Sequence, residues 1–491
     1  KIIKKTQSTN PEAKIEYIQK PEIKTTRKEI KENSKYVLSG KIMQSISGEV
    51  MLNAEITIDS LLVKAYSNEF GFFSVALPKG NHTITINYNN FYTISKQISI
   101  PEQTFVNIEM IANEKNLESQ KATIVQQEIT TKQSIEYHSQ DNVNQVNSHF
   151  LHTNNPIKDL EKLPGIQQIG DISSLFIVRG GNTDQNLIIL DDAPILNATH
   201  LFGYYSTFIP HTIKDIKIYK ANTPAQFGGK LSSVVDIRTN DGNENKLALF
   251  TEINPIASTI SIESPIVKKW AAVSLHIRKS NLSWLFKDSD GNSLYSFYDA
   301  HAKINFKINN KHRFYYSLYS GGDNFNEISQ KNGDFGIAWS NVANSFRWNY
   351  IVSPKIFSNT TLYGSSYNYY LYTPNQNFDY WNSKIETGGL KSDITYFKNN
   401  NNTIRFGFDI SGFTFNPGNL HLTNQDLESW NPIVSSSTIG IVALYYSHEK
   451  HFTSKSSITY GARMPISSNR GHSVYYTFDE QANVIDTISY S

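Results

Sequence analysis

The sequence predicts a mainly β protein with three folded parts: a small β-sandwich, a compact α+β unit and about half of an antiparallel transmembrane β-barrel. Three observations predict this fold class. Short strands with period-two alternation lie within residues 36–111, apolar strands separated by tight turns lie within 156–242, and sustained alternation fills 243–491. No run of about 18 apolar residues occurs, so the sequence predicts no transmembrane helix.

The composition excludes several classes of function. The 491 residues exceed one ordinary core, so several domains are expected. A net charge of +2 argues against nucleic-acid binding through phosphate neutralisation. The absence of cysteine excludes disulfides, thiolate metal sites and cysteine nucleophiles. Aromatic residues make up 12% of the chain, which suits surfaces that are apolar on one side and wet on the other.

Residues 1–35 contain ten Lys or Arg and five Asp or Glu residues, without apolar periodicity. A segment of this composition buries too little apolar surface to order itself. We therefore expect a flexible basic extension, with contact to a partner or an anionic surface as the alternative. Because the chain starts at Lys1, we expect any secretory signal peptide to be already removed or outside this sequence.

Residues 36–111 form the predicted sandwich, with seven short strands between turns. This segment resembles the carboxypeptidase regulatory-like domain, a transthyretin-like sandwich, at Ser39-Gly40-Lys41, Asn68–Phe73 and Leu77–His82. The resemblance implies that Gly71 permits a chain reversal and that the aromatic residue after it packs between the sheets. It implies no peptidase chemistry.

Residues 112–155 are polar and are predicted to be a linker with one short strand at Ala122–Gln127. Within residues 156–242, an amphipathic segment ends at Pro164-Gly165, which is a helix stop. Because Leu187–Leu190 is apolar on both faces, we expect a central strand there. The strands expected in this unit are Phe176–Arg179, Leu187–Leu190, Ile213–Tyr219 and Val234–Arg238.

Residues 243–491 alternate between apolar and polar side chains over long stretches. For example, Ala302, Ile304 and Phe306 alternate with Lys303 and Asn305. Several such runs extend to about ten residues, the length that a tilted membrane strand needs. Short turns alternate with longer polar loops, as in outer-membrane barrels. A water-soluble sandwich has the same period and is the alternative, but the unit that precedes the strands favours a barrel around a plug.

Several ordered blocks of this chain resemble the TonB-dependent outer-membrane receptors, in the branch with a regulatory-like domain before the plug domain. The blocks are Leu163–Gln167, Val178–Gly181, Gln185–Asp192, His200–Gly203 and Phe227–Val234. The early barrel agrees at Glu263–Ile266 and Phe297–Asp299. The resemblance covers about residues 36–491 and implies a plug inside a barrel of about 22 strands.

Two pairs of glycines in these blocks have a direct physical interpretation. Gly180-Gly181 and Gly228-Gly229 supply positive φ angles and close backbone approach at tight turns. Arg179 stands at a strand end just before the first pair. In the family, a plug arginine at this place is thought to reach carboxylates of the barrel wall and to hold the plug. A salt bridge within the turn is the alternative.

The resemblance also implies active uptake of an extracellular ligand, which binds the outer loops and the plug apex. The inner-membrane TonB complex then pulls an N-terminal segment from the periplasmic side, and strand addition requires a few extended residues for this contact. The candidate residues are Thr123, Ile124 and Val125, with an ordinary linker strand as the alternative. No cofactor is implied. Other expected partners are outer-membrane lipid and either a surface lipoprotein or a larger outer-membrane complex.

No catalytic or metal-binding constellation is found, so we expect no enzyme activity. Asp191-Asp192 are paired carboxylates, but they follow a strand directly and precede Ala193-Pro194. This position favours turn chemistry over acid–base catalysis. His448 and His451 have the wrong spacing for a zinc pair on a helix.

About ten or eleven strand candidates fit between Leu247 and Ser491, half the number in a plugged transporter. Open strand edges in lipid are very costly, so we expect the other strands to lie outside this sequence or on a second chain. The count motivates a second functional hypothesis. In this alternative, a receptor-like barrel is a structural subunit of an outer-membrane assembly or secretion complex and does not transport.

Overall fold

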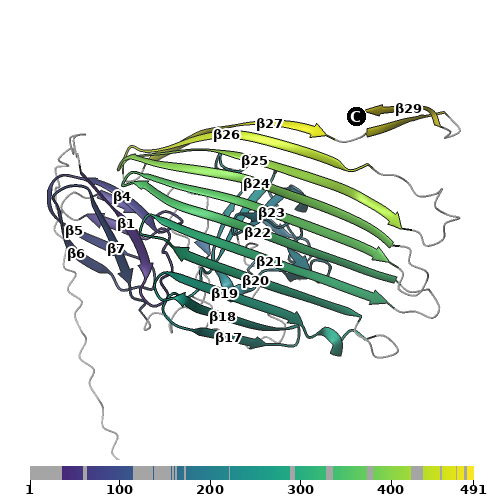
Figure 1. Ribbon diagram of the computed structural model, residues 1–491, viewed down its shortest axis with the longest axis horizontal. Coiled ribbons are helices and arrows are strands. Elements are labelled where there is room, and N and C mark those ends of the chain that lie inside the picture. Colours follow the sequence, from purple (N-terminus) through teal and green to yellow (C-terminus); the bar gives the residue numbers. More distant parts are fainter. Residues whose placement is uncertain are drawn as a thin grey trace, which may run out of the picture.

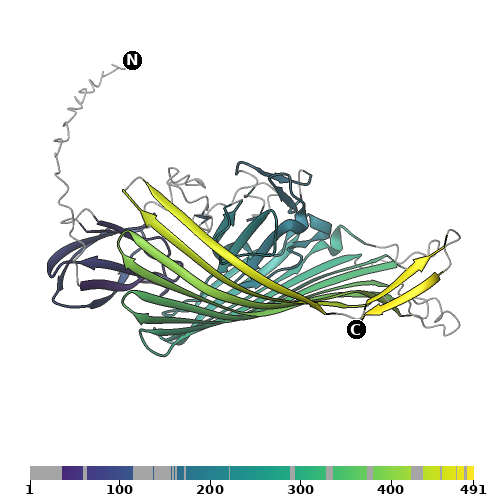
Figure 2. The ribbon, with the colours of Figure 1, turned by 90° about the horizontal axis from the view of Figure 1, so that it is seen from above.

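A curved sheet of long strands makes up most of the molecule, and the smaller elements of the middle of the chain lie against its concave side (Figure 1, Figure 2). The β-sandwich lies at one end of these strands. The elements of the described residues are strands and short 3-10 turns. The structure is a computed structural model that describes residues 36–58, 63–113, 136–137, 156–157, 160, 163–170, 173–220, 222–287, 294–327, 335–372, 380–421, 435–453, 456–470, 473–479 and 484–490.

The sandwich contains all seven strands that the sequence predicts. They are β1 (Tyr36–Gln44), β2 (Glu55–Ile58), β3 (Val63–Tyr66), β4 (Phe72–Leu77), β5 (Gly80–Asn87), β6 (Ile94–Ile100) and β7 (Thr104–Met110). One sheet has the order β4-β1-β7 and the other has the order β3-β2-β5-β6. Phe73 is buried between the sheets, whereas Phe72 packs outside the sandwich, against the large sheet.

The middle of the chain, residues 136–242, forms what we call the plug unit. Its elements are β8 (Glu136–Tyr137), β9 (Ile166–Gln168), β10 (Phe176–Val178), η3 (Thr183–Gln185), β11 (Asn186–Leu190), β12 (Ala193–Pro194), β13 (Thr199–His200), η4 (Leu201–Gly203), β14 (Tyr205–Ser206), η5 (Pro210–Thr212), β15 (Ile213–Tyr219) and β16 (Ser233–Thr239). The main sheet has the order β12-β11-β16-β15-β8. Hairpins β9–β10 and β13–β14 stand beside it.

The four strands predicted in this unit are present, and β11 lies between β12 and β16, as expected of a central strand. Its burial on both faces is less complete than its apolar sequence suggests. In β11, Leu187 and Ile188 are only half-buried, whereas all residues of β16 are buried. Ile188 and Tyr363 of the large sheet both pack against the buried apolar cluster of the plug unit, which accounts for an apolar residue at the half-buried position 188. The apolar residues of the predicted amphipathic segment are buried in the same core: Ile157, Leu160 and Leu163.

The large sheet has eleven antiparallel strands in sequential order. They are β17 (Ala248–Ile253), β18 (Ala257–Val267), β19 (Ala271–Ser280), β20 (Tyr295–Lys307), β21 (His312–Glu327), β22 (Phe335–Ser353), β23 (Ile356–Tyr372), β24 (Tyr380–Asn399), β25 (Asn402–His421), β26 (Ser437–His451) and β27 (Ser457–Arg470), with η6 (Leu282–Trp284) before β20. A separate hairpin pairs β28 (Ser473–Phe478) with β29 (Val484–Tyr490). The predicted ten or eleven candidates between Leu247 and Ser491 match the large sheet but do not include the two strands of the separate hairpin that follows it. Within the described residues, no helix has the length and apolar character that crossing a membrane requires.

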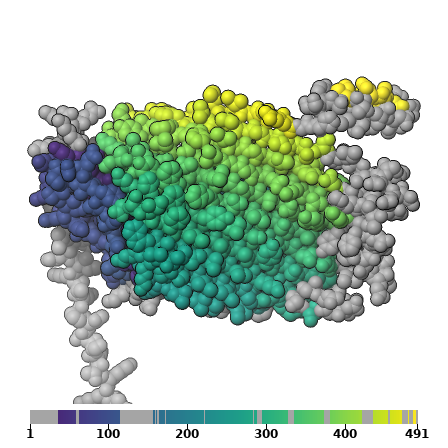
Figure 3. Space-filling model, in the orientation of Figure 1, coloured from purple at the N-terminus to yellow at the C-terminus, as the bar shows by residue number. Residues whose placement is uncertain are grey.

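The large sheet is apolar outside and polar inside, the reverse of a water-soluble sandwich. In β20, Lys303 and Asn305 are at most 1% exposed, whereas Ile304 is 38% exposed. In β19, His276 is buried and Ile277 is exposed. Figure 3 shows the outer face of this sheet, with the sandwich packed against one end. The alternation therefore places polar side chains against the plug unit, and the soluble alternative is wrong.

The two ends of the large sheet differ in the length of their connections. Residues 308–311, 354–355 and 400–401 connect strands at the end where the sandwich packs, which we call the short-turn end. At the opposite, long-loop end, residues 281–294 and 422–436 connect strands. This asymmetry agrees with the predicted alternation of short turns and longer loops.

Candidate functional site

The candidate site begins at the turn after β11. Asp191 and Asp192 have φ angles of 46° and 76°, a left-handed conformation that costs about 1 kcal/mol or more for each residue. The turn directs both carboxylates to basic residues of the inner wall, the face of the large sheet that faces the plug unit. We infer that these ion pairs offset the strain of the turn.

Asp191 is held by a lysine of the inner wall. Its Oδ1 accepts a hydrogen bond from Lys303 Nζ at 2.9 Å, and its Oδ2 accepts one from Ser317 Oγ at 3.1 Å. The Thr239 hydroxyl of the plug unit donates to the same Oδ2. Burial alone would raise the pKa of Asp191, but the Lys303 ammonium holds it well below its usual range. Asp191 is therefore an ionised carboxylate.

Two further acidic residues of the plug unit extend this contact. Asp192 Oδ2 accepts a hydrogen bond from Arg347 Nε at 2.5 Å, and Asp241 Oδ1 lies 2.9 Å from Lys303 Nζ. A buried ion pair adds little net stability compared with an apolar pair, but the loss of one partner costs about 3–5 kcal/mol. The contact therefore fixes the plug unit in one orientation. We call it the plug–wall network; its members are Asp191, Asp192, Asp241, Lys303 and Arg347.

A second buried cluster fixes the plug unit nearer the long-loop end. His200 Nδ1 lies 2.6 Å from Asp323 Oδ2, and its Nε2 lies 2.9 Å from Asp299 Oδ1. Arg278 donates to Asp299 Oδ2 and to the backbone oxygen of Ser206, both at 2.7 Å. Burial alone would lower the pKa of His200, but the two carboxylates raise it. An imidazolium that donates from both nitrogens fits this geometry.

An aromatic turn of the plug unit faces the long-loop end. Leu201 and Phe202 have φ angles of 52° and 54°, which are unusual for bulky residues. The Phe202 ring centroid lies 5.1–5.9 Å from the rings of Tyr295, Phe325 and Trp339. Even so, Phe202 is 53% exposed. An exposed aromatic in a strained turn on a rigid base is a candidate ligand contact.

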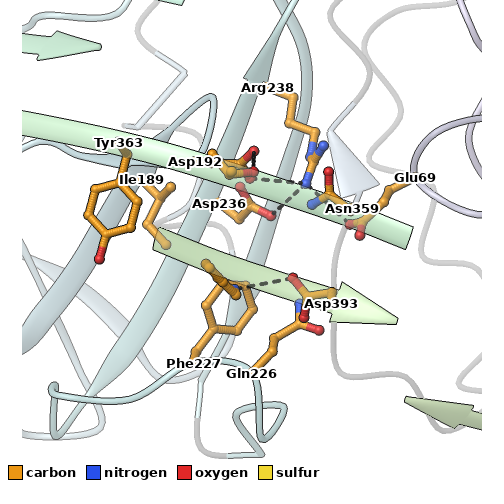
Figure 4. Close-up of a pocket in the computed structure, with 12 residues that line it drawn as sticks. Glu69, Ile189, Asp192, Gln226, Phe227, Asp236, Arg238, Asn359, Tyr363 and Asp393 are labelled. Carbon is orange, nitrogen blue, oxygen red and sulfur yellow. Dashed lines mark hydrogen bonds and ion pairs between the residues drawn. The ribbon is translucent and has the colours of Figure 1, made fainter. Parts of the chain in front are cut away.

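A small polar cavity lies where the plug unit, the sandwich and the inner wall meet (Figure 4). Its volume is about 30 Å³, enough for one or two water molecules. Arg238 points toward three carboxylates there, with its Nη2 3.4–3.8 Å from those of Glu69, Asp192 and Asp236. Burial raises the pKa of Asp236 to about 6, although Arg238 opposes this shift. The other charged lining residues are Lys391 and Asp393 of β24.

A second acidic residue of the sandwich reaches the plug unit beside this cavity. Glu49 Oε2 lies 2.5 Å from Lys214 Nζ, which also lies 3.1 Å from Asp241 Oδ2. The Asp241 N–H donates to Glu49 Oε1. Burial raises the pKa of Glu49 to about 7; Lys214 opposes this shift, and Asp241 and Glu263 add to it. Glu49 and Glu69 thus connect the sandwich to basic residues of the plug unit.

The predicted glycine pairs have the geometry expected of tight turns. Gly180 and Gly229 have φ angles of 77° and 81°. A Cβ atom at Gly181 would lie 2.6 Å from Ser232 Oγ, and one at Gly228 would lie 2.6 Å from an arginine of β27. One member of each pair thus supplies the positive φ, and the other permits the close approach. A functional role of these turns stays a prediction.

Arg179 is exposed at the beginning of its turn, with a φ angle of 50°. Its N–H donates to the backbone oxygen of Gly165 at 2.9 Å, and its Cγ lies near the same glycine. In the plug–wall network, the acidic residues belong to the plug unit and the basic residues belong to the wall. The contact suggested for Arg179 has the opposite arrangement, with a basic residue of the plug and carboxylates of the wall. A holding role for Arg179 stays a prediction, and Thr123, Ile124 and Val125 lie outside the described residues.

Sequence reasoning does not find the partners of the acidic turn. Lys303 is recognisable as a residue of the polar face of its strand, but 112 positions separate it from Asp191. Glu49 and Lys214 are 165 positions apart. The sequence indicates only that the polar face of the strands includes Lys, Arg and Asp residues, which does not say which acid each base meets.

The contacts that the plug unit makes with the inner wall and the sandwich are ionic and aromatic. Among the residues that the structure describes, no group of three or more histidine and acidic side chains is placed to hold a metal ion. Asp191 and Asp192 lie in a turn, and both are engaged with basic residues of the inner wall. The arrangement is suited to holding one folded unit against another and to presenting aromatic surface at the long-loop end.

Two protein-family models match the chain. A CarboxypepD_reg-like domain matches residues 38–124, and a TonB-dependent Receptor Plug Domain matches residues 129–234. The plug match begins near β8, ahead of the boundary at residue 156 that the sequence suggested. No curated protein matches the chain.

Solved structures of outer-membrane receptors and transporters are similar in fold. The copper transporter OprC has a TM-score of 0.50 at 10% identity, over 68% of this chain and 55% of that one. The siderophore receptor PirA from Acinetobacter baumannii has a TM-score of 0.49 at 12% identity, over 69% and 57%. The FrpB iron transporter from Neisseria meningitidis (F3-3 variant) has a TM-score of 0.47 at 11% identity, over 65% and 58%.

These comparisons establish the domains and the fold. The chain contains a carboxypeptidase regulatory-like domain, which is the sandwich, followed by a TonB-dependent receptor plug domain. At about 10% identity, the similarity to OprC shows the fold alone. The chain spans less than two thirds of the length of each of these structures.

Proposed function

We propose that this protein is an outer-membrane TonB-dependent receptor that imports an extracellular ligand through a barrel closed by the plug unit. The plug–wall network carries the proposal. A folded unit that is held inside a curved sheet by buried ion pairs blocks passage and has to be loosened before a ligand can pass. The proposed activity is transport without catalysis.

The surface of the large sheet supports a place in the outer membrane. Its outer face exposes apolar side chains such as Leu275, Ile277 and Leu362, and its polar side chains lie inside. In outer-membrane barrels, short turns face the periplasm and long loops face the outside. By this rule, the sandwich lies in the periplasm and Phe202 faces arriving ligand.

Energised opening fits the order of the chain. The candidate TonB contact, Thr123–Val125, lies between the sandwich and β8. In the described part of this segment, strand β8 pairs with β15 at Tyr137 with Ile216 and at Glu136 with Lys217. Because β8 is the last strand in the order of the plug sheet, tension on the linker reaches the edge of that sheet first. Larger rearrangement then requires release of the plug–wall network.

The proposal is tested by cross-linking to TonB in the native cell envelope. Cells that produce the full-length protein are treated with formaldehyde, and its adduct with TonB is measured on immunoblots. Replacement of Thr123, Ile124 and Val125 by Gly, Pro and Gly should abolish the adduct, because strand addition needs extended residues with free N–H groups. The same replacement at residues 130–132 of the linker is the matched control and should leave it intact.

Two results of this experiment contradict parts of the proposal. An adduct that persists in the 123–125 variant would move the contact elsewhere. If the wild-type protein gives no TonB adduct but purifies with other outer-membrane proteins, the structural-subunit alternative is favoured and import is refuted.

A further inference from the structure

The sandwich is joined to the plug unit through buried charges. Glu49 is paired with Lys214 at 2.5 Å, and the two side chains are 9% and 13% exposed. Glu69 Oε2 lies 3.4 Å from Arg238 Nη2 and 3.7 Å from Lys217 Nζ. Because these groups are withdrawn from water, separating the two units requires several ion pairs to be broken together.

The same domain is joined to the short-turn end of the large sheet through an aromatic contact. Phe357 of β23 stacks on Phe70 and Phe72 of the sandwich, with ring centroids 5.2 Å and 5.5 Å apart. Phe72 and Phe357 are almost completely buried, and Ile351 completes the cluster. Burial and stacking of these rings stabilise the docked position.

One side chain of the short turn between β24 and β25 also covers an edge of the sandwich. The backbone N–H of Ala76 in β4 donates to Asn400 Oδ1 at 2.7 Å, and Asn400 Nδ2 donates to the Ala76 oxygen at 2.9 Å. The amide thus satisfies the unpaired backbone groups of an edge strand, as a neighbouring strand would. The sandwich is docked by specific contacts and not by linker tethering alone.

The charged contacts of the sandwich continue into the plug–wall network. Lys214, the partner of Glu49, also meets Asp241, which in turn meets Lys303 of the wall. Arg238, the partner of Glu69, also meets Asp192, which is paired with a wall arginine. Two continuous series of alternating charges therefore run from the sandwich through the plug unit to the inner wall.

We propose that the N-terminal sandwich is a latch: docked at the short-turn end, it holds the plug unit in place, and its release precedes movement of the plug. This inference rests on the proposed function, because it assigns the sandwich a task in opening the same barrel. The geometry supports it, since the sandwich is bound to the plug unit and to the wall at once. A plug that leaves the wall must either carry the sandwich with it or separate from it.

The position of the linker fits this task. The sandwich ends near Asn113, the plug unit begins at β8, and the linker between them carries the candidate TonB contact. Tension applied within the linker acts on the sandwich at one end and on the plug sheet at the other. A single pulling force on the linker therefore acts on the docked sandwich and on the plug sheet together.

The latch is tested by a reversible bridge between the sandwich and the wall. Residues 1–491 contain no cysteine, so Ala76→Cys and Asn400→Cys introduce the only two thiols of this sequence, and any cysteine elsewhere in the full-length protein is replaced by serine. A reducible bifunctional thiol reagent joins the two thiols. The full-length protein is inserted into planar lipid bilayers in potassium chloride, and the rate at which urea opens the channel is recorded before and after reduction. The bridged state should open at least about tenfold more slowly than the reduced state.

A matched bridge and a charge variant complete the experiment. Glu55→Cys with Lys64→Cys joins two strands within the sandwich, at an exposed ion pair, and should not change the opening rate. Glu69→Gln removes the acidic partner of Arg238 and Lys217 without changing the size of the side chain, and should speed opening by about tenfold. The reduced state of each bridged protein is its own control for folding.

The outcomes distinguish the latch from the function on which it rests. Equal opening rates in the bridged and reduced states of the Ala76–Asn400 pair, with channels that do open, would refute the latch and leave the receptor intact. If neither variant nor wild type conducts at any urea concentration, the plugged barrel itself is refuted, and the latch with it.

Discussion

Replacement of Lys303 by methionine should loosen the plug unit strongly. The substitution keeps the length of the side chain but removes the ammonium that Asp191 and Asp241 share, each at 2.9 Å. Loss of one partner of a buried ion pair costs about 3–5 kcal/mol. Asp191 keeps hydrogen bonds from the hydroxyl groups of Ser317 and Thr239, so we expect the lower end of this range, about 3 kcal/mol. That cost corresponds to a change of roughly 100-fold in the equilibrium between held and released plug.

The assay is urea unfolding of the purified protein in detergent, followed by tryptophan fluorescence and by protease sensitivity of the plug unit. Lys64→Met is the matched control, because the Lys64–Glu55 pair is at 2.5 Å but its side chains are 57% and 27% exposed. That exposed pair should contribute at most about 1 kcal/mol. Adding Asp191→Asn to Lys303→Met should recover part of the loss. The reasoning is refuted if Lys303→Met costs no more than Lys64→Met.

Three further predictions concern the same contacts. Docking raises the pKa of Glu49 from 4.5 to about 7, so between these pH values Glu49 is protonated in the docked sandwich and ionised in the free one. Docking should therefore weaken as pH rises through this window. Glu49→Gln should flatten the slope of the urea midpoint against pH. Phe357→Ala should cost about 3–5 kcal/mol of docking free energy and increase hydrogen exchange around Phe72, whereas unchanged exchange would exclude the aromatic contact as a docking determinant. His200→Leu leaves two wall carboxylates without their imidazole partner, and should lower the urea midpoint by at least as much as Lys303→Met; a neutral effect would show that this cluster does not hold the plug.

Much of the fold follows from local sequence patterns. The seven strands of the sandwich and the eleven strands of the large sheet are predictable because a half-buried strand requires alternation with a period of two, whichever partner it pairs with. Turn positions such as Gly180 and Gly229 are also predictable from local sequence, because a backbone position with a positive φ favours glycine. The alternation does not say which face is buried, and Lys303 and Ile304 show that here the polar one is.

The candidate site depends on contacts that local patterns do not contain. The turn at Asp191-Asp192 is evident in the sequence, but its carboxylates become a holding device only because the curvature of the sheet brings Lys303 and Arg347 to them. The docked position of the sandwich likewise requires Glu49 and Phe72 to meet residues far along the chain. Sequence by itself determined the strands, their turns and the domain order, because these depend on each residue and its near neighbours. Only the tertiary structure decided which charges meet, because an ion pair depends on distance in space, and many acids and bases along the chain were equally available.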